Sequence, residues 1–366
     1  MSFKSKFKYA LNRYMHMSKL SLALRISASV ILIVAIGLII GLREPISRKI
    51  YNWGEVRPES SSQVHFISVG QGDATLFEFG DGKTALVDAG PSSSSEILVD
   101  YIKDQKINKI DYFFLTHADA DHVGGGVSIF QSFEVGNFYR PMTRCLSESS
   151  PSDYPQHDTY IYNAVITEAY ACVPQENIYY SSTALGEITD TNFKIKFLYP
   201  DKPYSSTNAS SLAMMIEMQG YKFLMMGDCE LKQENLITTI YKDQLKCDVL
   251  KLGHHGAATS TGTTLLSYAK PDYGVISVGE NNYGHPSGQV LSNLKMYGVS
   301  YFNTLEEGDI VFDVDGQLFV RSSHGKMIDY ALICVILGTI VLIIWSIPEP
   351  KHKKKKKSSK NNLVKN

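Results

Sequence analysis

The spacing of apolar positions changes along the chain between a period of two, typical of strands, and a period of three to four, typical of helices. Two groups of predicted strands result, and helices follow each group. The first group is predicted at residues 63–69, 74–79, 84–87 and 112–115, with a helix at 96–104. The second group is predicted at residues 193–198, 212–218 and 221–226, followed by alternating helices and strands at 230–241, 249–252, 263–270, 273–278 and 287–296, and by short strands from residues 300, 309 and 317.

Glycine-containing turns join neighbouring strands in both groups. Gly80-Asp81-Gly82 and Gln219-Gly220 are typical of hairpin turns, because glycine adopts the positive φ that such turns need. Two groups of mainly antiparallel strands, each followed by helices, predict an α+β fold. We expect a β-sandwich with helices on its outer faces, an αββα arrangement.

Two uncharged runs flank this central region. The first, at residues 26–42, follows a basic N-terminus and is close to the shortest length that spans a membrane. We interpret it as an uncleaved anchor; a cleavable signal peptide is the alternative, although no small-residue cleavage site follows Leu42. The second run, at residues 330–347, lies within a predicted span at 328–347 and precedes a tail with five consecutive lysines. Positive residues beside a span tend to stay cytoplasmic, so both termini are predicted inside and the domain between them outside the cell membrane.

The predicted organisation therefore has a central domain between two transmembrane helices. We expect contact with membrane lipid, and a membrane-protein partner is an open alternative. The stretch at 138–182, rich in Tyr, Ser and Pro, is predicted as a helix-containing insertion that leans over the candidate site. The segments are a basic N-terminus at 1–25, a span at 26–42, a linker at 43–62, the domain at 63–326, a second span at 328–347 and a Lys-rich tail at 348–366.

Composition adds limits on partners and on redox chemistry. Between residues 43 and 328 there are 22 Lys and Arg against 35 Asp and Glu, so the central region is acidic, which argues against tight, sequence-blind binding of nucleic acid. The cysteines lack Cys-x-x-Cys spacing, which excludes a zinc ribbon. Cys145 and Cys172 are interpreted either as a disulfide or as two free thiols, and Cys229 and Cys247 as small core residues.

Four potential metal ligands follow the strand at 112–115. They are His117, Asp119, Asp121 and His122, and three glycines after them are expected to let the backbone turn tightly. Histidine offers an imidazole nitrogen and aspartate a carboxylate oxygen, so the two pairs suit two cations a few ångströms apart. A solvated polar loop is the alternative interpretation of this cluster alone.

Further residues extend this cluster into a pattern that resembles the metallo-β-lactamase fold, and more closely the extracytoplasmic hydrolase domain of ComEC-type DNA-uptake proteins. The resemblance runs from about residue 64 to residue 320. The stretches that carry it are Val69-Gly70-Gln71-Gly72-Asp73-Ala74, Asp88-Ala89-Gly90, Thr116-His117-Ala118-Asp119-Ala120-Asp121-His122, Gly227-Asp228, Lys251-Leu252-Gly253-His254-His255-Gly256, Ile276-Ser277-Val278-Gly279 and Asn281-Asn282-Tyr283-Gly284-His285-Pro286-Ser287.

The resemblance implies a two-metal centre with ligands at specific positions. His117 and Asp119 would hold the first ion, Asp121 and His122 the second, and Asp228 would bridge them. One histidine of the following pair would complete the second position: His254 is preferred because it stands first after its strand, and His255 is the alternative. Asp88 is expected to orient a ligand, and Asp73 either does the same or caps a turn.

Two departures from the family pattern affect the expected metal. Most two-zinc members have histidine where this chain has Asp119, and they supply another histidine in the stretch that here reads Thr207-Asn208-Ala209-Ser210-Ser211. Oxygen in place of nitrogen shifts the preference from Zn²⁺ toward Mn²⁺ or Mg²⁺. Asn208 is predicted to contribute an amide oxygen, or to contact the substrate phosphate; capping of the loop is the alternative.

These residues predict a membrane-anchored, metal-dependent phosphodiesterase that acts outside the cytoplasm. A ComEC-like nuclease acting on DNA is the leading hypothesis, with Asp121, Asn208 and His285 as catalytic residues; His285 would contact phosphate or protonate the leaving oxygen. One alternative is hydrolysis of other extracellular phosphodiesters, such as teichoic-acid decorations or phosphocholine esters. Another is a non-catalytic membrane scaffold. Two spans cannot form a DNA channel, so no import is inferred.

Overall fold

The computed structural model describes residues 19–41, 62–323 and 330–347 of the chain. These residues divide into two compact units, Met1–Pro45 with Ile328–Asn366 and Ile46–Met327, and each unit is described by itself. The predicted linker lies almost entirely outside the described residues. The Lys-rich tail and most of the basic N-terminus also lie outside them.

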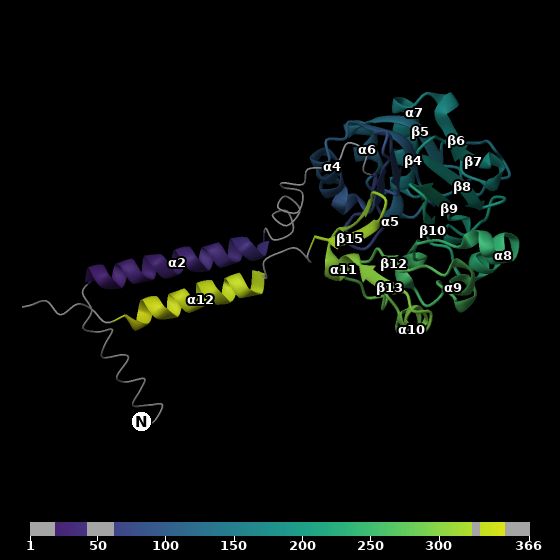
Figure 1. The fold of residues 1–366 in the computed structure, drawn as a ribbon. Coiled ribbons are helices and arrows are strands. Elements are labelled where there is room, and N and C mark those ends of the chain that lie inside the picture. The colour runs from purple at the N-terminus through teal and green to yellow at the C-terminus, as the bar shows by residue number, and fades with distance from the viewer. Residues whose placement is uncertain (1–18, 42–61, 324–329, 348–366) are drawn as a thin grey trace, which may run out of the picture. The chain divides into compact units, whose positions relative to one another are not determined.

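The smaller unit is a pair of helices, α2 (Lys19–Gly41) and α12 (Tyr330–Ser346), that lie side by side (Figure 1). The Arg25 guanidinium donates to the carbonyl oxygens of Ile344 (2.8 Å) and Ile347 (2.7 Å), which lie at the end of α12. Such carbonyls have no partner within their own helix. The Trp345 indole donates to Ser29 Oγ at 2.8 Å.

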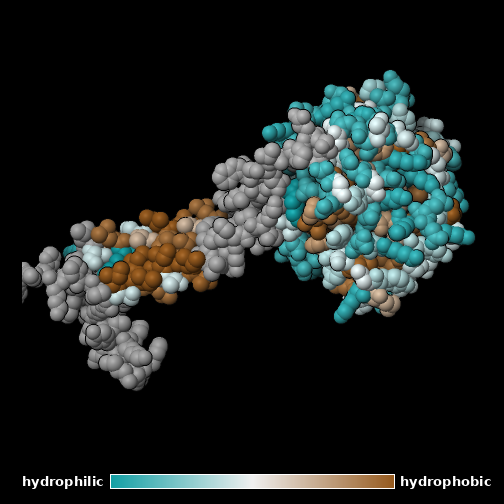
Figure 2. All heavy atoms as spheres, in the orientation of Figure 1, coloured by the Kyte–Doolittle hydropathy of each residue, from teal (hydrophilic) through white to brown (hydrophobic). Residues whose placement is uncertain are grey.

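The face of the two helices that Figure 2 shows is mostly apolar. Within the described part of the chain, one segment, Ser21–Leu38, is long and apolar enough to cross a membrane. An anchor and a signal sequence both meet that criterion. Helix α12 has 17 residues and a shorter apolar segment, Val335–Ser346. A second transmembrane span therefore remains a prediction.

The larger unit is a sandwich of two mixed sheets (Figure 1). The first sheet has eight strands in the order β15 (Leu318–Ser322), β14 (Ile310–Val314), β1 (Ser62–Phe66), β2 (Thr75–Glu78), β3 (Thr84–Val87), β4 (Lys109–Phe114), β5 (Glu134–Arg140) and β6 (Ile178–Tyr180). The second has seven strands in the order β13 (Ser300–Asn303), β12 (Tyr273–Ile276), β11 (Val249–Lys251), β10 (Tyr221–Met225), β9 (Ala213–Met218), β8 (Phe193–Tyr199) and β7 (Glu187–Thr189).

Helices cover the outer face of each sheet, as predicted (Figure 1). The helices on the first sheet are α4 (Ser95–Asp104), α6 (Gly126–Ser132) and α7 (Tyr160–Cys172), and those on the second are α8 (Leu231–Tyr241), α9 (Thr263–Ala269) and α10 (Gly288–Met296). Helix α4 buries Leu98, Val99 and Ile102 while Glu96 and Asp100 on its other face are exposed. Short helices and 3₁₀ turns complete the unit: α5 (Ala120–Val123), α11 (Thr304–Glu307), Ser92–Ser94, Gln175–Asn177, Thr183–Leu185, Asn208–Ser210, Lys242–Leu245 and His254–Gly256.

A separate apolar cluster fills the space between the two sheets. The ring centroids of Phe77 from the first sheet and Phe223 from the second lie 5.8 Å apart, edge to face. With outer clusters under the helices on both sides, the unit has four layers. The predicted αββα sandwich is therefore confirmed for this unit.

Strand direction differs from the prediction of mainly antiparallel groups. Within the described residues, β3–β4, β4–β5, β5–β6, β10–β11, β11–β12 and β12–β13 pair in parallel, and the other seven pairings are antiparallel. Parallel neighbours need a crossover connection, usually a helix. The helices α4, α6, α7, α8, α9 and α10 lie in these crossovers. Apolar alternation within a single strand does not show which strand will be its neighbour.

The stretch at 138–182 is continuous with the first sheet. Its first residues belong to β5 and its last strand, β6, extends the sheet beyond β5. Between them lies α7, so the predicted helix is confirmed. Cys145 and Cys172 are both free thiols, one buried and one exposed, and the disulfide alternative was wrong. Cys229 and Cys247 are buried as predicted, whereas the side chain of Cys334 lies outside the described residues.

Candidate metal centre

The His/Asp cluster begins directly after β4. Asp119 is the N-cap residue of α5, and Asp121 and His122 lie within that helix. The side chains of His117 and His122 have no exposed surface, whereas those of Asp119 and Asp121 are 34% and 36% exposed. The cluster therefore has a buried side and an open side.

Gly124 and Gly125 allow this cluster to pack against the segment that follows β3. A Cβ atom on Gly124 would lie 2.3 Å from Ser92 N, and one on Gly125 would lie 2.3 Å from Ala89 O. Both glycines have ordinary helical backbone, with φ of −57° and −80°. These two glycines are thus required for close packing rather than for the tight turn expected from the sequence.

Asp88, just after β3, holds the rings of the cluster from behind. Its carboxylate accepts from Thr116 N and Thr116 Oγ1, both at 2.8 Å, and lies 2.8 Å from His122 Nδ1. Since the Thr116 hydroxyl proton is used on Asp88, its oxygen accepts from His117 Nδ1 at 3.0 Å. Both histidines are therefore bonded through Nδ1, and Nε2 is left for the centre. Asp88 thus fixes the orientation of the His122 ring, and its expected role toward a metal ligand stays a prediction.

Asp228 lies at the middle of the centre. It follows β10 and Gly227, whose φ is +50°, and its backbone N–H donates to Ser211 Oγ at 3.0 Å. One carboxylate oxygen lies 3.2 Å from His122 Nε2 and the other 3.7 Å from His117 Nε2. That second oxygen is also 3.7 Å from His255 Nε2 and 3.8 Å from His254 Nε2.

The paired histidines after β11 enter the site from different directions. His254 and His255 both have positive φ, +47° and +51°, a conformation that non-glycine residues adopt only where the surroundings impose it. His255 is buried, and its Nδ1 must donate to Ser277 O at 2.9 Å because a carbonyl only accepts. Its Nε2 then lies 3.2 Å from Asp121 Oδ2.

His254 is more exposed, at 24%, and is directed to another part of the site. Its Nε2 lies 3.5 Å from the Asn208 amide nitrogen, and its Nδ1 lies 3.6 Å from Glu230 Oε1. His255 thus groups with Asp121, whereas His254 borders the histidine-free stretch at 207–211. In that stretch Thr207 Oγ1 also donates to Asp119 Oδ2 at 3.0 Å.

A buried ion pair lies behind His255. Lys251 Nζ contacts Asp73 Oδ2 at 2.7 Å and donates to Leu252 O at 3.0 Å, and both side chains of the pair are at most 5% exposed. Asp73 Oδ1 lies 3.3 Å from His255 Nδ1. Burial opposes ionisation of Asp73, but Lys251 and His255 hold its pKa below the usual range. Asp73 thus contacts His255 from the side away from Asp121.

Lys251 was not singled out from the sequence. A lysine at the end of β11, Val249–Lys251, in a strand that is otherwise apolar, was the signal that could have found it. A buried lysine needs a buried anion, and Asp73 was a candidate.

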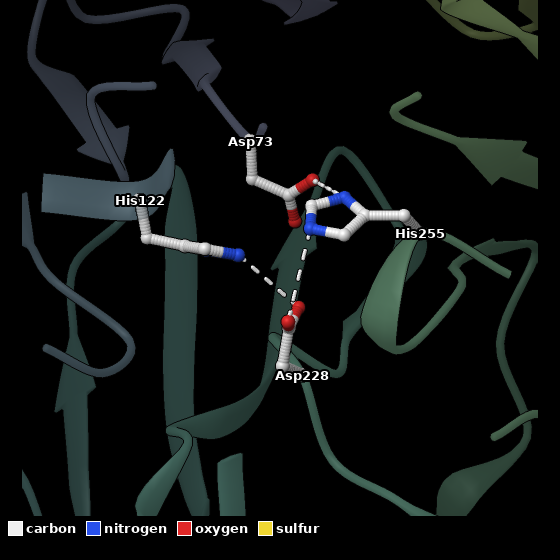
Figure 3. Close-up of side chains that lie close together, drawn as sticks. All are labelled: Asp73, His122, Asp228 and His255. Atoms are coloured by element: carbon white, nitrogen blue, oxygen red, sulfur yellow. Dashed lines mark ion pairs between the residues drawn. The ribbon is translucent and has the colours of Figure 1, made fainter. Parts of the chain in front are cut away.

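The donor atoms fit divalent cations. Atoms of Asp73, His122, Asp228 and His255 lie within 4.8 Å of one another (Figure 3). His117 Nε2, His122 Nε2 and Asp228 Oδ1 are buried and make no hydrogen bond within the described part of the chain. Their contacts within the centre are ion-pair contacts of 3.2 to 3.7 Å, so a cation that binds all three would satisfy them better and would stabilise this arrangement.

The buried imidazoles and carboxylates of the centre shift one another's pKa values. Burial would lower the pKa of His122 and of His255. Asp228 and Asp88 nevertheless raise the pKa of His122. Asp228 and Asp121 raise the pKa of His255 to about 10. Burial would raise the pKa of Asp228, but His122 and His255 hold it well below its usual value. The carboxylates therefore draw protons onto the imidazoles, and metal ions would replace those protons.

The centre opens into a cavity of about 570 Å³. It is lined by Gln71, Pro91, Ser92, Ser93, Asp119, Ala120, Asp121, Ile161, Asp228, His254, His255, Tyr283 and His285. Ile161 comes from α7, so the inserted stretch does reach the site. Burial and the neighbouring His254 and His255 lower the pKa of His285. Lys and Arg are missing from this lining.

The comparisons with known proteins agree with the family resemblance that the motifs carry. The family described as Metallo-beta-lactamase superfamily matches residues 67–280. ComE operon protein 3 of Bacillus subtilis is 28% identical over 275 residues, which are 69% of this chain and 33% of that protein. Recombination protein 2 of Haemophilus influenzae is 26% identical over 254 residues, 68% and 28% of the two chains. The chain spans about a third of the length of these relatives, and the resemblance stated from the motifs is confirmed.

Solved structures give distant matches. The metallo-beta-lactamase fold protein YhfI from Bacillus subtilis aligns with 69% of this chain and 99% of its own, at 12% identity and a TM-score of 0.44. Tm1679, described as a metal-dependent hydrolase of the beta-lactamase superfamily, aligns with 68% of this chain and 98% of its own, at 10% identity and a TM-score of 0.42.

Proposed function

This chain belongs to the metallo-beta-lactamase superfamily, and from that premise we propose that it is a metal-dependent phosphodiesterase whose substrate is a nucleic acid strand. One observation carries the proposal: buried nitrogens of His117 and His122 that make no hydrogen bond lie against Asp228, and Asp228 lines an open cavity. A structural site would be closed, whereas a hydrolytic site needs room for substrate beside the ions.

We assign the ligands to two positions that share Asp228. The second position has Asp121, His122 and His255; His255 replaces His254 there because its buried Nε2 lies 3.2 Å from Asp121. The first position has His117 and Asp119. His254 and Asn208 lie on the side of this position, where other family members supply a further histidine. Asp119 and Asp121 favour Mn²⁺ or Mg²⁺ over Zn²⁺, because carboxylate oxygens are harder ligands than imidazole nitrogens.

Two divalent cations bound there would supply an activated water and would neutralise charge on the phosphoryl group. The protein's own groups do the positioning. Asp88 and Thr116 hold the rings of His117 and His122, so that little reorganisation accompanies the reaction. His285 lines the cavity, and its Nδ1 makes no hydrogen bond to the described residues. We assign His285 to the substrate phosphate, which its lowered pKa suits as a neutral hydrogen-bonding group.

Nucleic acid is proposed as substrate because the Haemophilus influenzae relative is named for recombination. A second candidate is a small phosphodiester of the cell envelope. The acidic character of residues 43–328 and the lack of Lys and Arg in the cavity lining favour it, since nucleic acid binding usually relies on basic groups.

We further propose that the protein is held in the cell membrane by α2 and by a second span that includes α12. The basic termini would be cytoplasmic, and the β-rich unit would face outward. The support is the apolar helix Ser21–Leu38, the apolar surface of α12 and the positive residues that flank both. Lipid is then the expected partner.

The test uses the full chain, purified in detergent and stripped of metal. Mn²⁺, Mg²⁺ or Zn²⁺ is added, and cleavage of single- and double-stranded DNA, of glycerol-phosphate polymer and of bis-p-nitrophenyl phosphate is measured. Asp121→Ala is the inactive variant, and Asp100→Ala, on the exposed face of α4, is the matched control. We expect Mn²⁺-dependent DNA cleavage that Asp121→Ala abolishes. Cleavage of the polymer alone would support the second candidate, and no cleavage by metal-loaded protein would leave a scaffold.

A further inference from the structure

The most exposed aromatic side chain in the cavity lining is Tyr283. It lies in the loop between β12 and α10, and it is 77% exposed although it borders the site. A molecule that covers this ring would bury apolar surface and gain free energy from it. Its place beside the candidate metal centre points to substrate as that molecule.

The loop that carries Tyr283 is held in one conformation by Asn281. The Asn281 side-chain oxygen accepts from Tyr283 N and His285 N, both at 3.1 Å. Its amide nitrogen donates to Gly279 O at 2.9 Å and to His285 O at 2.8 Å. All four hydrogen-bonding positions of one side chain are used within the loop. Tyr283 is therefore presented on a preorganised loop, which lowers the entropy lost on binding.

A short series of rings connects Tyr283 to the metal centre. Its ring centroid lies 5.8 Å from that of His285, with the planes 35° apart, and the His285 ring lies 5.5 Å from that of His254. His254 in turn faces Asp228 at 3.8 Å. A phosphate bound beside His254 and His285 would thus place the next group of its own chain near Tyr283.

The cavity lining also includes apolar side chains. Pro91 and Ile161 line the cavity, and the charged groups of the lining are those of the metal centre. A flat, weakly polar group suits a cavity that has both apolar side chains and an exposed tyrosine in its lining. Nucleobases have this form and stack on aromatic rings whatever their identity. The polyol and sugar units of envelope phosphodiesters have no such π-face.

We propose that Tyr283 is the stacking platform for the nucleobase next to the scissile phosphate. The inference rests on the phosphodiesterase function proposed above and names nucleotides as its substrate class. Stacking gives affinity without reading sequence, so the expected preference is for nucleotides over base-free diesters, with little discrimination among the four bases. It also provides binding that needs no basic groove, in keeping with the absence of Lys and Arg from the lining.

The experiment measures binding as well as turnover. The full chain in detergent, loaded with Mn²⁺, is titrated calorimetrically with deoxyadenosine 5′-monophosphate and with 2-deoxyribose 5-phosphate, which lacks the base. The variants are Tyr283→Ala, Tyr283→Phe and Tyr297→Ala, an exposed tyrosine outside the cavity lining. We expect Tyr283→Ala to weaken binding of the nucleotide about ten-fold more than binding of the sugar phosphate, and Tyr283→Phe to retain the wild-type ratio.

Four outcomes would overturn the proposal, and three of them concern the variants. They are equal weakening of both ligands, no weakening of either, or an equal loss in Tyr297→Ala. A wild-type protein that binds neither ligand would do so as well. Turnover of methyl p-nitrophenyl phosphate by the same preparations separates the two proposals. Turnover without a Tyr283-dependent base preference contradicts the stacking platform alone, and Tyr283-dependent nucleotide binding without diester turnover contradicts the phosphodiesterase alone.

Discussion

The buried floor and the open rim of the metal centre are built in opposite ways. The floor consists of His117, His122, Asp228 and His255, with Asp73, Asp88 and Lys251 behind them, and each of these side chains is at most 5% exposed. The rim consists of Asp119, Asp121, His254, His285 and Tyr283, which are all partly exposed.

Floor residues are held by charge-assisted bonds from several elements, whereas rim residues rest on helix α5 and on loops. The carboxylate of Asp88 accepts two hydrogen bonds from Thr116 and contacts His122. Asp119 has one hydroxyl partner, Thr207, and a contact to His117. The difference implies that the floor sets where ligand atoms lie and that the rim adapts to what binds. Changes in the floor should therefore affect metal binding and stability, and changes in the rim should affect substrate binding.

The largest effect is expected from Asp228→Asn. This change removes the charge shared by both metal positions and leaves the buried histidines without their carboxylate, so we expect loss of bound metal from both positions. Asp119→Asn, on the rim, should retain the ion of the second position. Metal analysis of the purified full chain, with Mn²⁺ electron paramagnetic resonance, measures both. Equal metal contents in the two variants would contradict the distinction between floor and rim.

Lys251→Met should be the most destabilising change that touches no proposed ligand. It leaves the Asp73 carboxylate buried without its cation, which typically costs about 3–5 kcal/mol. The double variant Asp73→Asn with Lys251→Met should recover much of that loss, since no buried charge remains. Urea unfolding of the metal-free full chain in detergent, followed by tyrosine circular dichroism, measures the free energies.

Lys109→Met is the matched surface control for this ion pair. Lys109 is 48% exposed and pairs with Glu134 on the surface, so its loss should cost less than about 1 kcal/mol. If the losses in unfolding free energy from Asp73→Asn and Lys251→Met simply add in the double variant, the buried pair has no special role. The same holds if Lys109→Met costs as much as Lys251→Met.

The buried carboxyl group of Glu234 should make the free energy of unfolding depend on pH. This buried side chain accepts from Gly262 N at 2.8 Å and from Thr261 N, in the segment that follows His255, and burial raises its pKa to about 7. Because the folded chain binds this proton more tightly than the unfolded chain, the stability that Glu234 contributes is fully present below pH 4.5 and is lost as pH rises through about 7. The loss is about 3 kcal/mol at most.

Glu234→Gln removes this titration. Compared with wild type, its unfolding free energy should change less between pH 5 and pH 8, measured in the metal-free full chain. The variant also loses one of two acceptors, so its stability at pH 5 should be lower than that of wild type. If the unfolding free energy of the wild type rises from pH 5 to pH 8 relative to that of the variant, the assigned direction of the Glu234 pKa shift is wrong.

The smallest effects are expected from groups that orient the ligands. Asp88→Asn should weaken Mn²⁺ binding about 10- to 100-fold, because His122 loses the carboxylate that fixes its ring. Thr207→Val, which removes the single hydroxyl on Asp119, should weaken binding less than about ten-fold. Competition with a fluorescent chelator measures both dissociation constants. If Thr207→Val is the weaker binder, the rim is more preorganised than its exposure suggests.

Local features of the chain could be predicted because short-range chemistry controls them. The hairpins at Gly80-Asp81-Gly82 and Gln219-Gly220 depend on positive φ, and Gly82, Gln219 and Gly220 do have it. Helix α4 follows from its own apolar spacing. The cluster from His117 to His122 could be recognised because four donor residues within six positions are close whatever the fold.

Only the tertiary structure decided how distant segments meet. Strand direction depends on which strands become neighbours, so the parallel pairs were not predicted. His254 and His255 are adjacent and chemically identical, and what separates them is the backbone conformation at φ of +47° and +51° and the position of Ser277 O. Lys251 acquired its role from Asp73, which lies far away in sequence. The ligand types were thus determined by the sequence alone, whereas their order, burial and partners required the packed sheets, because burial and long-range pairing are properties of the folded chain.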